Sequence, residues 1–426
     1  MKVLKKIGKV LACIVLIVAI LLLIGLNCKT VLAARKNADV IAAAKPFEEL
    51  MIPEGVQIVG LGEASHGCIE FQESKLDVLK MLVEKYDYRA IAIEADFNDC
   101  LAINAYIQGG EGDARSLVND LSFVIYHTQQ MADLVEWMRT YNATASEDKK
   151  LRFYGFDMQN PEKGVPFLLS YLEEHAISDC ETTNLQLLAD EERSESLSEA
   201  DVSNIRSELD AIRKALEAAE QDLATVYAGK AVENIHTALD YYMLDYTEMN
   251  DFRDTAMAAN VSWLLELEKK IGTGKLMLAG HNGHTGIKGE TAFTKVTMGG
   301  VLKEQYGDAY YSLGTDFFKG DANIRVDGTQ DYQRKDFYVT TADPMAYQAK
   351  YQEGQRYVLD FTSLDETGDK AVYDMVHGNL TMGTLGEGFA TYYYLVHPSY
   401  RFSMAPVDLY DGMLFYYEVH AIQPEF

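Results

Sequence analysis

The chain has 426 residues, of which 48% are apolar and 24% charged, a composition typical of globular proteins rather than disordered or fibrous ones. Its 38 basic residues stand against 65 acidic ones, which gives a net charge of −27. Because nucleic-acid binding needs clustered basic side chains that neutralise phosphates, this balance excludes that class of function. The length allows several domains, but an α/β enzyme can use it for one core with insertions.

The N-terminus reads as a targeting segment. Four lysines precede the uncharged apolar run Val10–Leu26, whose 17 residues fall between a cleaved signal core of roughly 7–15 residues and a spanning helix of roughly 17–25. Val31–Ala34 offers small residues where a signal peptidase could cut. We therefore expect residues 1–34 to be a single-pass membrane anchor or a cleaved signal peptide. In both cases residues 35–426 lie outside the cell membrane, carrying a net charge of −32 from 33 basic and 65 acidic residues.

From residue 56 onward, short apolar runs alternate with longer helical patterns. This alternation predicts an α/β fold with a mostly parallel central sheet flanked by helices. The clearest predicted strands are Val56–Leu61, Arg89–Ile93, Leu151–Phe156, Lys275–Ala279 and Tyr310–Leu313. Residues at three- and four-residue spacing predict helices around Leu76–Val83 and Met131–Tyr141.

Residues 180–250 have a different pattern, typical of an inserted helical hairpin. Ser198 and Asp201 resemble a capping box. A ladder of apolar residues follows at steps of three and four, running from Val202 to Val226. Such a seam needs a partner, which the region from about Ala231 to Met249 could supply, although a dimerisation arm is the alternative. The last hundred residues, rich in Tyr and Phe, are expected to pack on the same core, so that residues 35–426 form one domain.

Ionisable residues follow four of the predicted strands. Because the carboxyl ends of parallel strands share one edge of a sheet, where ligands bind in such folds, these residues are candidates for a common site. They are Glu63 and His66 after the first strand, Glu94 and Asp96 after the second, Asp157 after the third, and His281 and His284 after the fourth.

The residue types at this edge suit acid–base chemistry. A histidine can take a proton from water while a neighbouring carboxylate orients its ring, and Glu63 with His66 has the spacing for such a pair. His281 and His284 could stabilise an oxyanion or, with carboxylates, bind a metal. Each residue also has a structural interpretation, as when Asp157 merely bonds the turn after its strand. No G-x-S-x-G, H-E-x-x-H, P-loop or dinucleotide motif is present.

Six blocks of this sequence together resemble the erythromycin esterase family. They cover the chain from about residue 45 to near the C-terminus, and their combination is specific although each alone is weak. The blocks are Gly60–Gly67 (GLGEASHG), Arg89–Asp96 (RAIAIEAD), Trp137–Asn142 (WMRTYN), Tyr154–Gln159 (YGFDMQ), Phe252–Asn260 (FRDTAMAAN) and Ala279–His284 (AGHNGH).

The resemblance implies hydrolysis of a carboxylic ester, which in named members is the macrolactone of a macrolide, by a water that a histidine activates without an acyl-enzyme. It implies an α/β core with a helical insertion and no cofactor. By position, His66 is the general base, and Glu63 and Glu94 are its supporting carboxylates.

The resemblance also suggests residues that bind the substrate. His281 and His284 line the site, and Arg253 contributes positive charge. Lys75 stands where many members carry an arginine near the site, and Asp157 is a further candidate. The expected partner is a small-molecule ester, although an extracellular member could act on a surface polymer, a lipid or a foreign ester.

Two other functions remain compatible with the same residues. In the first, Glu63, His66 and His281 or His284 bind a metal that hydrolyses an ester or peptide bond. In the second, a non-catalytic surface protein binds haem or lipid, with His66 as an iron ligand and the 27 tyrosines lining an amphipathic pocket. Among the cysteines outside the leader, Cys68, Cys100 and Cys180 have no metal-ligand spacing, and their pairing is open.

Overall fold

The computed structural model describes residues 14, 16, 17, 28–177, 179–189, 197–290, 294–329 and 333–425. Its contacts divide the chain into two compact units: unit 1 comprises residues 1–51, 63–71 and 313–422, and unit 2 comprises 52–62, 72–312 and 423–426. Most of the predicted leader, including nearly all of Val10–Leu26, lies outside the described residues, so its nature stays a prediction. Within the described part of the chain, no helix is long and apolar enough to cross a membrane.

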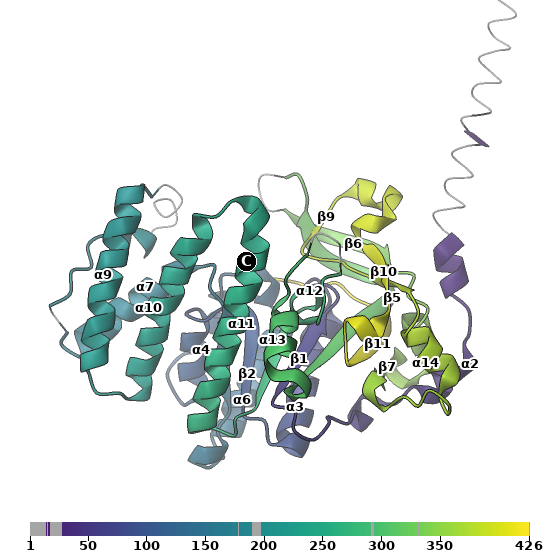
Figure 1. Ribbon diagram of the computed structural model, residues 1–426, viewed down its shortest axis with the longest axis horizontal. Coiled ribbons are helices and arrows are strands. Elements are labelled where there is room, and N and C mark those ends of the chain that lie inside the picture. Colours follow the sequence, from purple (N-terminus) through teal and green to yellow (C-terminus); the bar gives the residue numbers. More distant parts are fainter. Residues whose placement is uncertain are drawn as a thin grey trace, which may run out of the picture. The chain divides into compact units, whose positions relative to one another are not determined.

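Unit 2 is built on four strands in the order β3-β2-β4-β1 (Figure 1). These are β1 (Ile58–Glu63, whose last residue belongs to unit 1), β2 (Ala90–Asp96), β3 (Arg152–Asp157) and β4 (Leu276–His281). Strand β2 runs parallel to both β3 and β4. Nearly every residue of the four strands is buried, which explains why they read as continuous apolar runs rather than as alternating patterns. Each strand begins one or two residues later than predicted and continues into the polar residues that follow.

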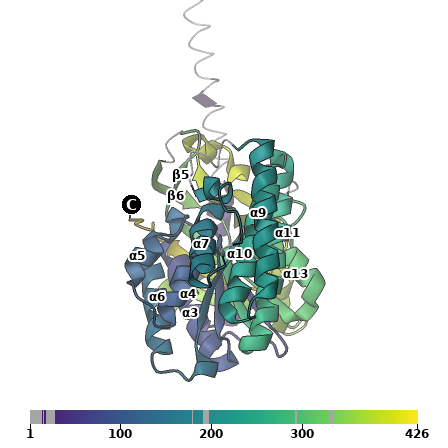
Figure 2. The same cartoon turned by 90° about the vertical axis from the view of Figure 1, so that its left-hand side faces the viewer.

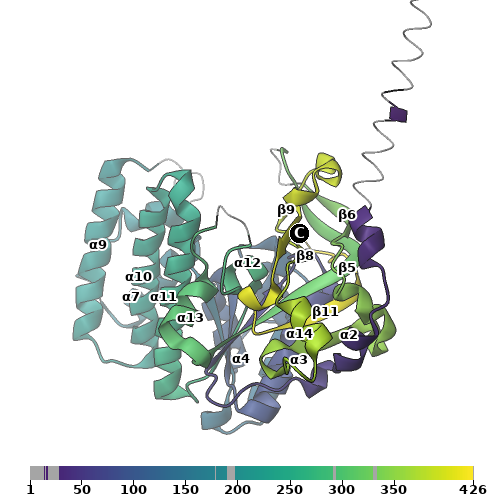
Figure 3. The same ribbon diagram turned by 45° about the vertical axis from the view of Figure 1, so that its right-hand side comes forward.

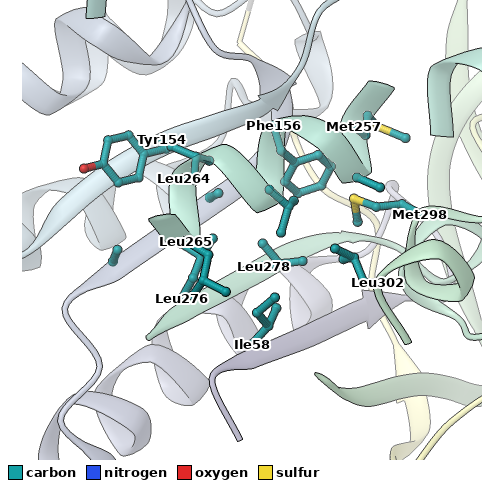
Figure 4. Packing of buried hydrophobic residues seen from close by; sticks show 14 of the residues in the cluster. Ile58, Tyr154, Phe156, Met257, Leu264, Leu265, Leu276, Leu278, Met298 and Leu302 are labelled. Atoms are coloured by element: carbon teal, nitrogen blue, oxygen red, sulfur yellow. The ribbon is translucent and has the colours of Figure 1, made fainter. Parts of the chain in front are cut away.

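Helix α11 packs on this sheet and forms the main core of unit 2. Figure 4 shows Leu264 and Leu265 of α11 among Ile58, Leu276 and Leu278 of the strands. The helices of unit 2 are α3 (Ile69–Tyr86, from Gln72 on), α4 (Cys100–Ile107), α5 (Ala114–Asn119), α6 (Gln129–Asn142), α7 (Gly164–Glu174), α9 (Glu199–Ala218), α10 (Leu223–Tyr242), α11 (Tyr246–Ile271), α12 (Asn282–Thr285) and α13 (Met298–Tyr306).

Helices α7, α9 and α10 lie side by side and enclose a second core (Figure 2). The predicted capping box is present, since Ser198 and Asp201 bond to each other's backbone N–H. The apolar ladder is not one helix. Helix α9 ends at Ala218, and Asp222 caps a new helix by accepting from the N–H of Thr225. The hairpin is therefore α9 against α10, and Leu223 of the predicted ladder is exposed.

Unit 1 contains mixed sheet and its own apolar core. Strand β11 (Gly412–Val419) runs parallel to β5 (Tyr310–Val326, from Leu313 on in this unit) and antiparallel to β7 (Arg356–Asp360). Strands β6 (Arg334–Thr340) and β9 (Gly388–Phe389) also pair with β5, while β8 (Leu380–Gly383) pairs with β10 (Arg401–Met404). Helix α2 (Ala38–Ala43) packs against α14 (Lys370–Val376), as Figure 3 shows. The core of unit 1 includes Tyr357, Leu359, Met413 and Phe415.

Candidate active site

The carboxyl ends of three parallel strands of unit 2 carry the predicted ionisable residues. Strand β2 ends on Asp96, β3 on Asp157 and β4 on His281. In the register of the sheet, Asp96 stands opposite Asp157, after an irregularity that begins at Ile93. Asp96, Asp157 and His281 are thus the last residues of their strands, so a rigid sheet and not a loop positions them.

Arg253 of α11 binds two of the carboxylates at this edge. Its guanidinium donates to both oxygens of Asp157, most closely from Nη2 to Oδ2 at 2.6 Å, and from the same Nη2 to Oε1 of Glu94 at 2.9 Å. All three side chains are largely buried. Burial opposes the charge of Arg253, but Asp157 and Glu94 outweigh it and raise the pKa of the guanidinium. The arginine is therefore a permanent cation held between two acids.

Glu94 also fixes the backbone at the end of β4. Its Oε2 accepts from the N–H of His281 at 2.7 Å. The neighbouring residue is Gly280, and a Cβ there would lie 2.9 Å from that same oxygen. The glycine in the AGHNGH block is needed because the Glu94 carboxylate occupies the space where a side chain would stand.

His284 lies in the same cluster and is held on both sides. Its Nδ1 is 2.9 Å from Oδ1 of Asp254, and its Nε2 is 3.1 Å from Nη1 of Arg253 and 3.3 Å from Oε1 of Glu94. Burial lowers the pKa of the imidazole, but Glu94 and Asp254 outweigh burial and the repulsion from Arg253, raising that pKa to about 10. His284 is accordingly protonated at neutral pH, and its Nε2–H is then directed to Glu94 rather than accepting from Arg253.

His281 has a defined tautomer. Its Nδ1 accepts from the N–H of Gly283 at 3.1 Å and caps the short helix α12. In the neutral ring the proton therefore lies on Nε2, which makes that nitrogen a donor. Helix α12 approaches β1 closely, since a Cβ on Gly62 would lie 2.2 Å from Oδ1 of Asn282. This approach explains the second glycine of the GLGE block.

Glu63 and His66 form a pair in unit 1. Nδ1 of His66 is 3.4 Å from Oε1 of Glu63, and both side chains are buried. The turn that carries them is tightly held: the N–H of Ala64 donates to Oγ1 of Thr315 at 2.9 Å, and a Cβ on Gly67 would lie 2.5 Å from the carbonyl oxygen of Asn323. The spacing predicted from the sequence thus does bring the acid and the imidazole together.

Lys75 is buried in unit 2, where its Nζ donates to Oε1 of Gln72 at 2.9 Å. The ammonium also lies 5.7 Å from the ring centre of Tyr126, whose hydroxyl donates to the carbonyl oxygen of Glu94 at 3.1 Å. One contact of Lys75 with the cluster runs through this tyrosine, and a direct role in substrate binding stays a prediction.

Sequence reasoning missed Asp254. This residue is buried, accepts from the N–H of Met298 at 2.7 Å through Oδ1, and holds Nδ1 of His284. The available signal was its place directly after Arg253 in the FRD block, at the start of a long helix. Adjacent positions of a helix point about 100° apart, so the pair can hold different partners.

The donor geometry bears on the metal-dependent alternative. Across the described ranges, no group of three or more His, Cys, Asp or Glu side chains is arranged to hold a metal ion. His284 has both ring nitrogens in contact with charged neighbours, and a metal would have to displace one of them. The described cysteines Cys28, Cys68, Cys100 and Cys180 are free thiols, and burial raises the pKa of Cys68.

A parallel α/β sheet with acids, an arginine and histidines at its carboxyl edge is typical of enzymes that use acid–base chemistry. The family model described as erythromycin esterase matches residues 83–419. Erythromycin esterase type II from Escherichia coli is 25% identical over 324 residues, which cover 65% of this chain and 72% of that protein.

Two solved structures share the fold. A Bacillus cereus protein aligns with a TM-score of 0.75 at 20% identity, covering 93% of this chain and 99% of the other. An erythromycin esterase mutant in an open conformation aligns with a TM-score of 0.58 at 16% identity, covering 88% and 92%. The chain belongs to the erythromycin esterase family, as its sequence blocks predicted, and this membership supports an esterase-like hydrolase.

Proposed function

We propose that the protein hydrolyses a carboxylic ester with a water that His66 activates. The observation that carries the proposal is the buried contact between His66 and Glu63 on a rigid turn, in a chain of this family. With Glu63 beside Nδ1, the neutral ring keeps its proton on Nδ1, which makes Nε2 the nitrogen that can accept a proton from water.

The reaction then follows ordinary acid–base steps. The water oxygen attacks the ester carbonyl carbon while its proton passes to Nε2 of His66, and Glu63 stabilises the imidazolium that forms. The tetrahedral intermediate collapses by breaking the bond to the alcohol oxygen. That oxygen takes the proton back from His66, which leaves the free alcohol and a carboxylic acid, and the acid then releases its remaining proton to water at neutral pH.

The Arg253 cluster has a different role in this proposal. With its pKa raised to about 10, His284 is charged at neutral pH and is a poor base. It is suited, with Arg253, to stabilise negative charge on a reacting oxygen, and Nε2–H of His281 is a further donor. The assignment of both groups to one reaction rests on the family blocks that contain them, and Glu94 holds the donors in place.

The substrate class is an ester, of which a macrolactone is one candidate. We also propose that Val10–Leu26 anchors the chain in the membrane, which would present the enzyme to extracellular esters. Extraction of cell membranes with alkaline carbonate tests the anchor, since a spanning segment stays in the pellet and a peripheral protein is released.

An ester panel that includes macrolides tests the hydrolase, with products followed by mass spectrometry in ¹⁸O water. A product that gains one labelled oxygen, with a drop of about 100-fold or more in His66→Asn, supports the proposal. His377→Asn is the matched control in unit 1, because that exposed ring contacts its own helix: it stacks on Tyr373 at 3.8 Å, and its Nδ1 lies 2.8 Å from the Tyr373 carbonyl oxygen.

A folded protein that turns over no ester would contradict the proposal. Activity that is lost on chelation and restored by added metal would favour the metal-dependent alternative. A coloured protein without turnover would favour haem binding.

A further inference from the structure

Unit 1 presents an uncharged segment on its surface. Residues 388–400 contain no Asp, Glu, Lys or Arg, although 24% of the chain is charged. The side chains of Tyr392, Leu395 and Val396 are 62%, 63% and 46% exposed. Contiguous exposed apolar side chains of this size are unusual on a soluble surface and mark a binding surface.

The fold holds these side chains outward. The segment continues from β9, which pairs with β5 beside β6 (Figure 3). Buried Phe389 packs against the rings of Tyr393 and Tyr394, with centres 5.3 and 5.1 Å apart. The hydroxyl of Tyr393 donates to Asp327, and that of Tyr394 donates to the carbonyl oxygen of Tyr338. These inward contacts hold the backbone while Tyr392, Leu395 and Val396 face solvent.

A second pair of exposed apolar side chains, Val31 and Leu32, is linked to this segment through Arg401. The guanidinium of Arg401 lies 3.2 Å from Nδ1 of His397 and donates to Oγ1 of Thr30 at 3.3 Å. His397 directly follows the exposed Val396, and Thr30 directly precedes Val31 and Leu32, which are 66% and 49% exposed. One arginine therefore joins the two apolar groups.

The position of Thr30 in the chain indicates what covers this surface. The uncharged run Val10–Leu26 ends four residues before Thr30. Four residues span at most about 14 Å when extended. If that run crosses a bilayer, as proposed above, Thr30 lies within this distance of the point where the chain leaves the membrane, with Val31 and Leu32 next in the chain and Arg401 in contact with it.

We propose that this surface, formed by Tyr392, Leu395, Val396, Val31 and Leu32, docks on the headgroup region of a zwitterionic lipid bilayer. Tyrosine favours that region because it has an apolar ring and a polar tip, and the aliphatic side chains reach the acyl boundary. Residues 35–426 carry a net charge of −32, so anionic lipid would repel the protein. The inference rests on the proposed anchor and is independent of the proposed hydrolysis.

The test uses the full chain in phosphatidylcholine vesicles with and without bromine on the acyl chains. Bromine quenches tryptophan fluorescence on contact, and the native Trp137 and Trp263 give the background. Tyr392→Trp should add emission that brominated lipid quenches. Met51→Trp, an exposed position of the same unit at 65%, should add emission that is not quenched. Adding Leu395→Glu and Val396→Glu to Tyr392→Trp should abolish the quenching while the protein still floats with the vesicles.

Three results would overturn the inference. They are unquenched Tyr392→Trp emission in a protein that floats with the vesicles, equal quenching of Met51→Trp, and a protein that does not float at all. A fourth contrary result is a change in Tyr392→Trp emission that depends on protein concentration and not on brominated lipid. That result would indicate that a second copy of the chain covers the surface. Ester hydrolysis measured in the same samples bears on the enzyme alone, so failure of one proposal is distinguishable from failure of the other.

Discussion

Helix α11 is joined to strand β3 by an arginine–carboxylate pair at each end, and the two pairs differ in one respect. At the amino end of the strand, Nε and Nη2 of Arg152 donate to the two oxygens of Glu268, each at 2.6 Å. The hydroxyl of Tyr154 donates to the same carboxylate at 2.9 Å. One cation therefore meets one anion, and the anion is fully bonded.

At the carboxyl end the pairing is not one to one. Arg253 serves both Asp157 and Glu94, and His284 lies between Arg253 and Asp254. Three carboxylates thus share one guanidinium and one imidazole. This excess of negative charge is what raises the pKa of His284 to about 10, with Glu94 and Asp254 overcoming the effect of burial.

This difference in pairing distinguishes a structural ion pair from a candidate site when both are buried. In a one-to-one pair such as Arg152 with Glu268, both charges are already paired with each other. Replacing both partners of such a pair by apolar residues is often neutral for stability. A shared arginine among several acids is costly to bury and gives no better packing. We infer that the amino end fixes the helix, whereas the carboxyl end is kept for chemistry.

The largest expected effect separates the two arginines by activity. Arg253→Met should reduce hydrolysis by about 100-fold or more, because a removed electrostatic donor typically costs this much. Arg152→Met should leave kcat of the remaining folded enzyme nearly unchanged. Both variants should lose about 3–5 kcal/mol of unfolding free energy, because each leaves a buried carboxylate unpaired.

Because that loss could unfold either variant, double replacements give the sharper comparison. Arg152→Leu with Glu268→Leu should recover most of the stability and keep activity, whereas Arg253→Leu with Asp157→Leu should recover stability without activity. Urea unfolding and initial rates on the best ester measure both. An inactive Arg152→Leu/Glu268→Leu protein that is fully folded would refute the distinction between the ends.

A smaller effect is expected from Asp254→Asn. Losing this carboxylate should lower the pKa of His284 from about 10, which NMR titration of the imidazole measures directly. Activity should fall by about 10-fold, since Asp254 only positions His284, and a positioning residue contributes less than the donor that it holds. Unchanged His284 titration would show that Glu94 alone sets its charge.

The same variant changes stability with pH in a defined direction. Because the folded pKa of His284 is raised above its ordinary value of 6.5, its contribution is complete below about pH 6.5 and is lost as pH rises toward 10. The wild type should therefore lose on the order of 4 kcal/mol of unfolding free energy across that window. Asp254→Asn should lose less, as urea unfolding at pH 6.5 and 9.5 would show.

The sequence predicted the strands and their polar ends because buried parallel strands are continuous apolar runs, and their direction brings the carboxyl ends to one edge. These two rules were enough to predict that the same edge of the sheet carries Glu94, Asp157 and His281. The fold class and the family are confirmed by the comparisons. The Glu63–His66 contact followed from local spacing alone.

What could not be predicted depends on how a helix is rotated or where it stops. Asp254 is found only once α11 is seen to turn it toward His284 while Arg253 faces β3. The ladder from Val202 to Val226 kept helical spacing across a break, since Asp222 can continue a helix or cap one. Apolar periodicity does not distinguish these outcomes.

The smallest expected effect tests whether the amino end of β3 is purely structural. Tyr154→Phe removes one hydrogen bond to Glu268 while Arg152 keeps both of its own, so the unfolding free energy should fall by about 1 kcal/mol. The rate of hydrolysis should not change, because the hydroxyl of Tyr154 lies against Glu268 and Tyr227, which the proposed reaction does not use. Urea unfolding and initial rates on the same sample measure both quantities. A rate loss in a protein of normal stability would mean that the amino end of β3 transmits its charge to the other end, and the two arginines would then belong to one network.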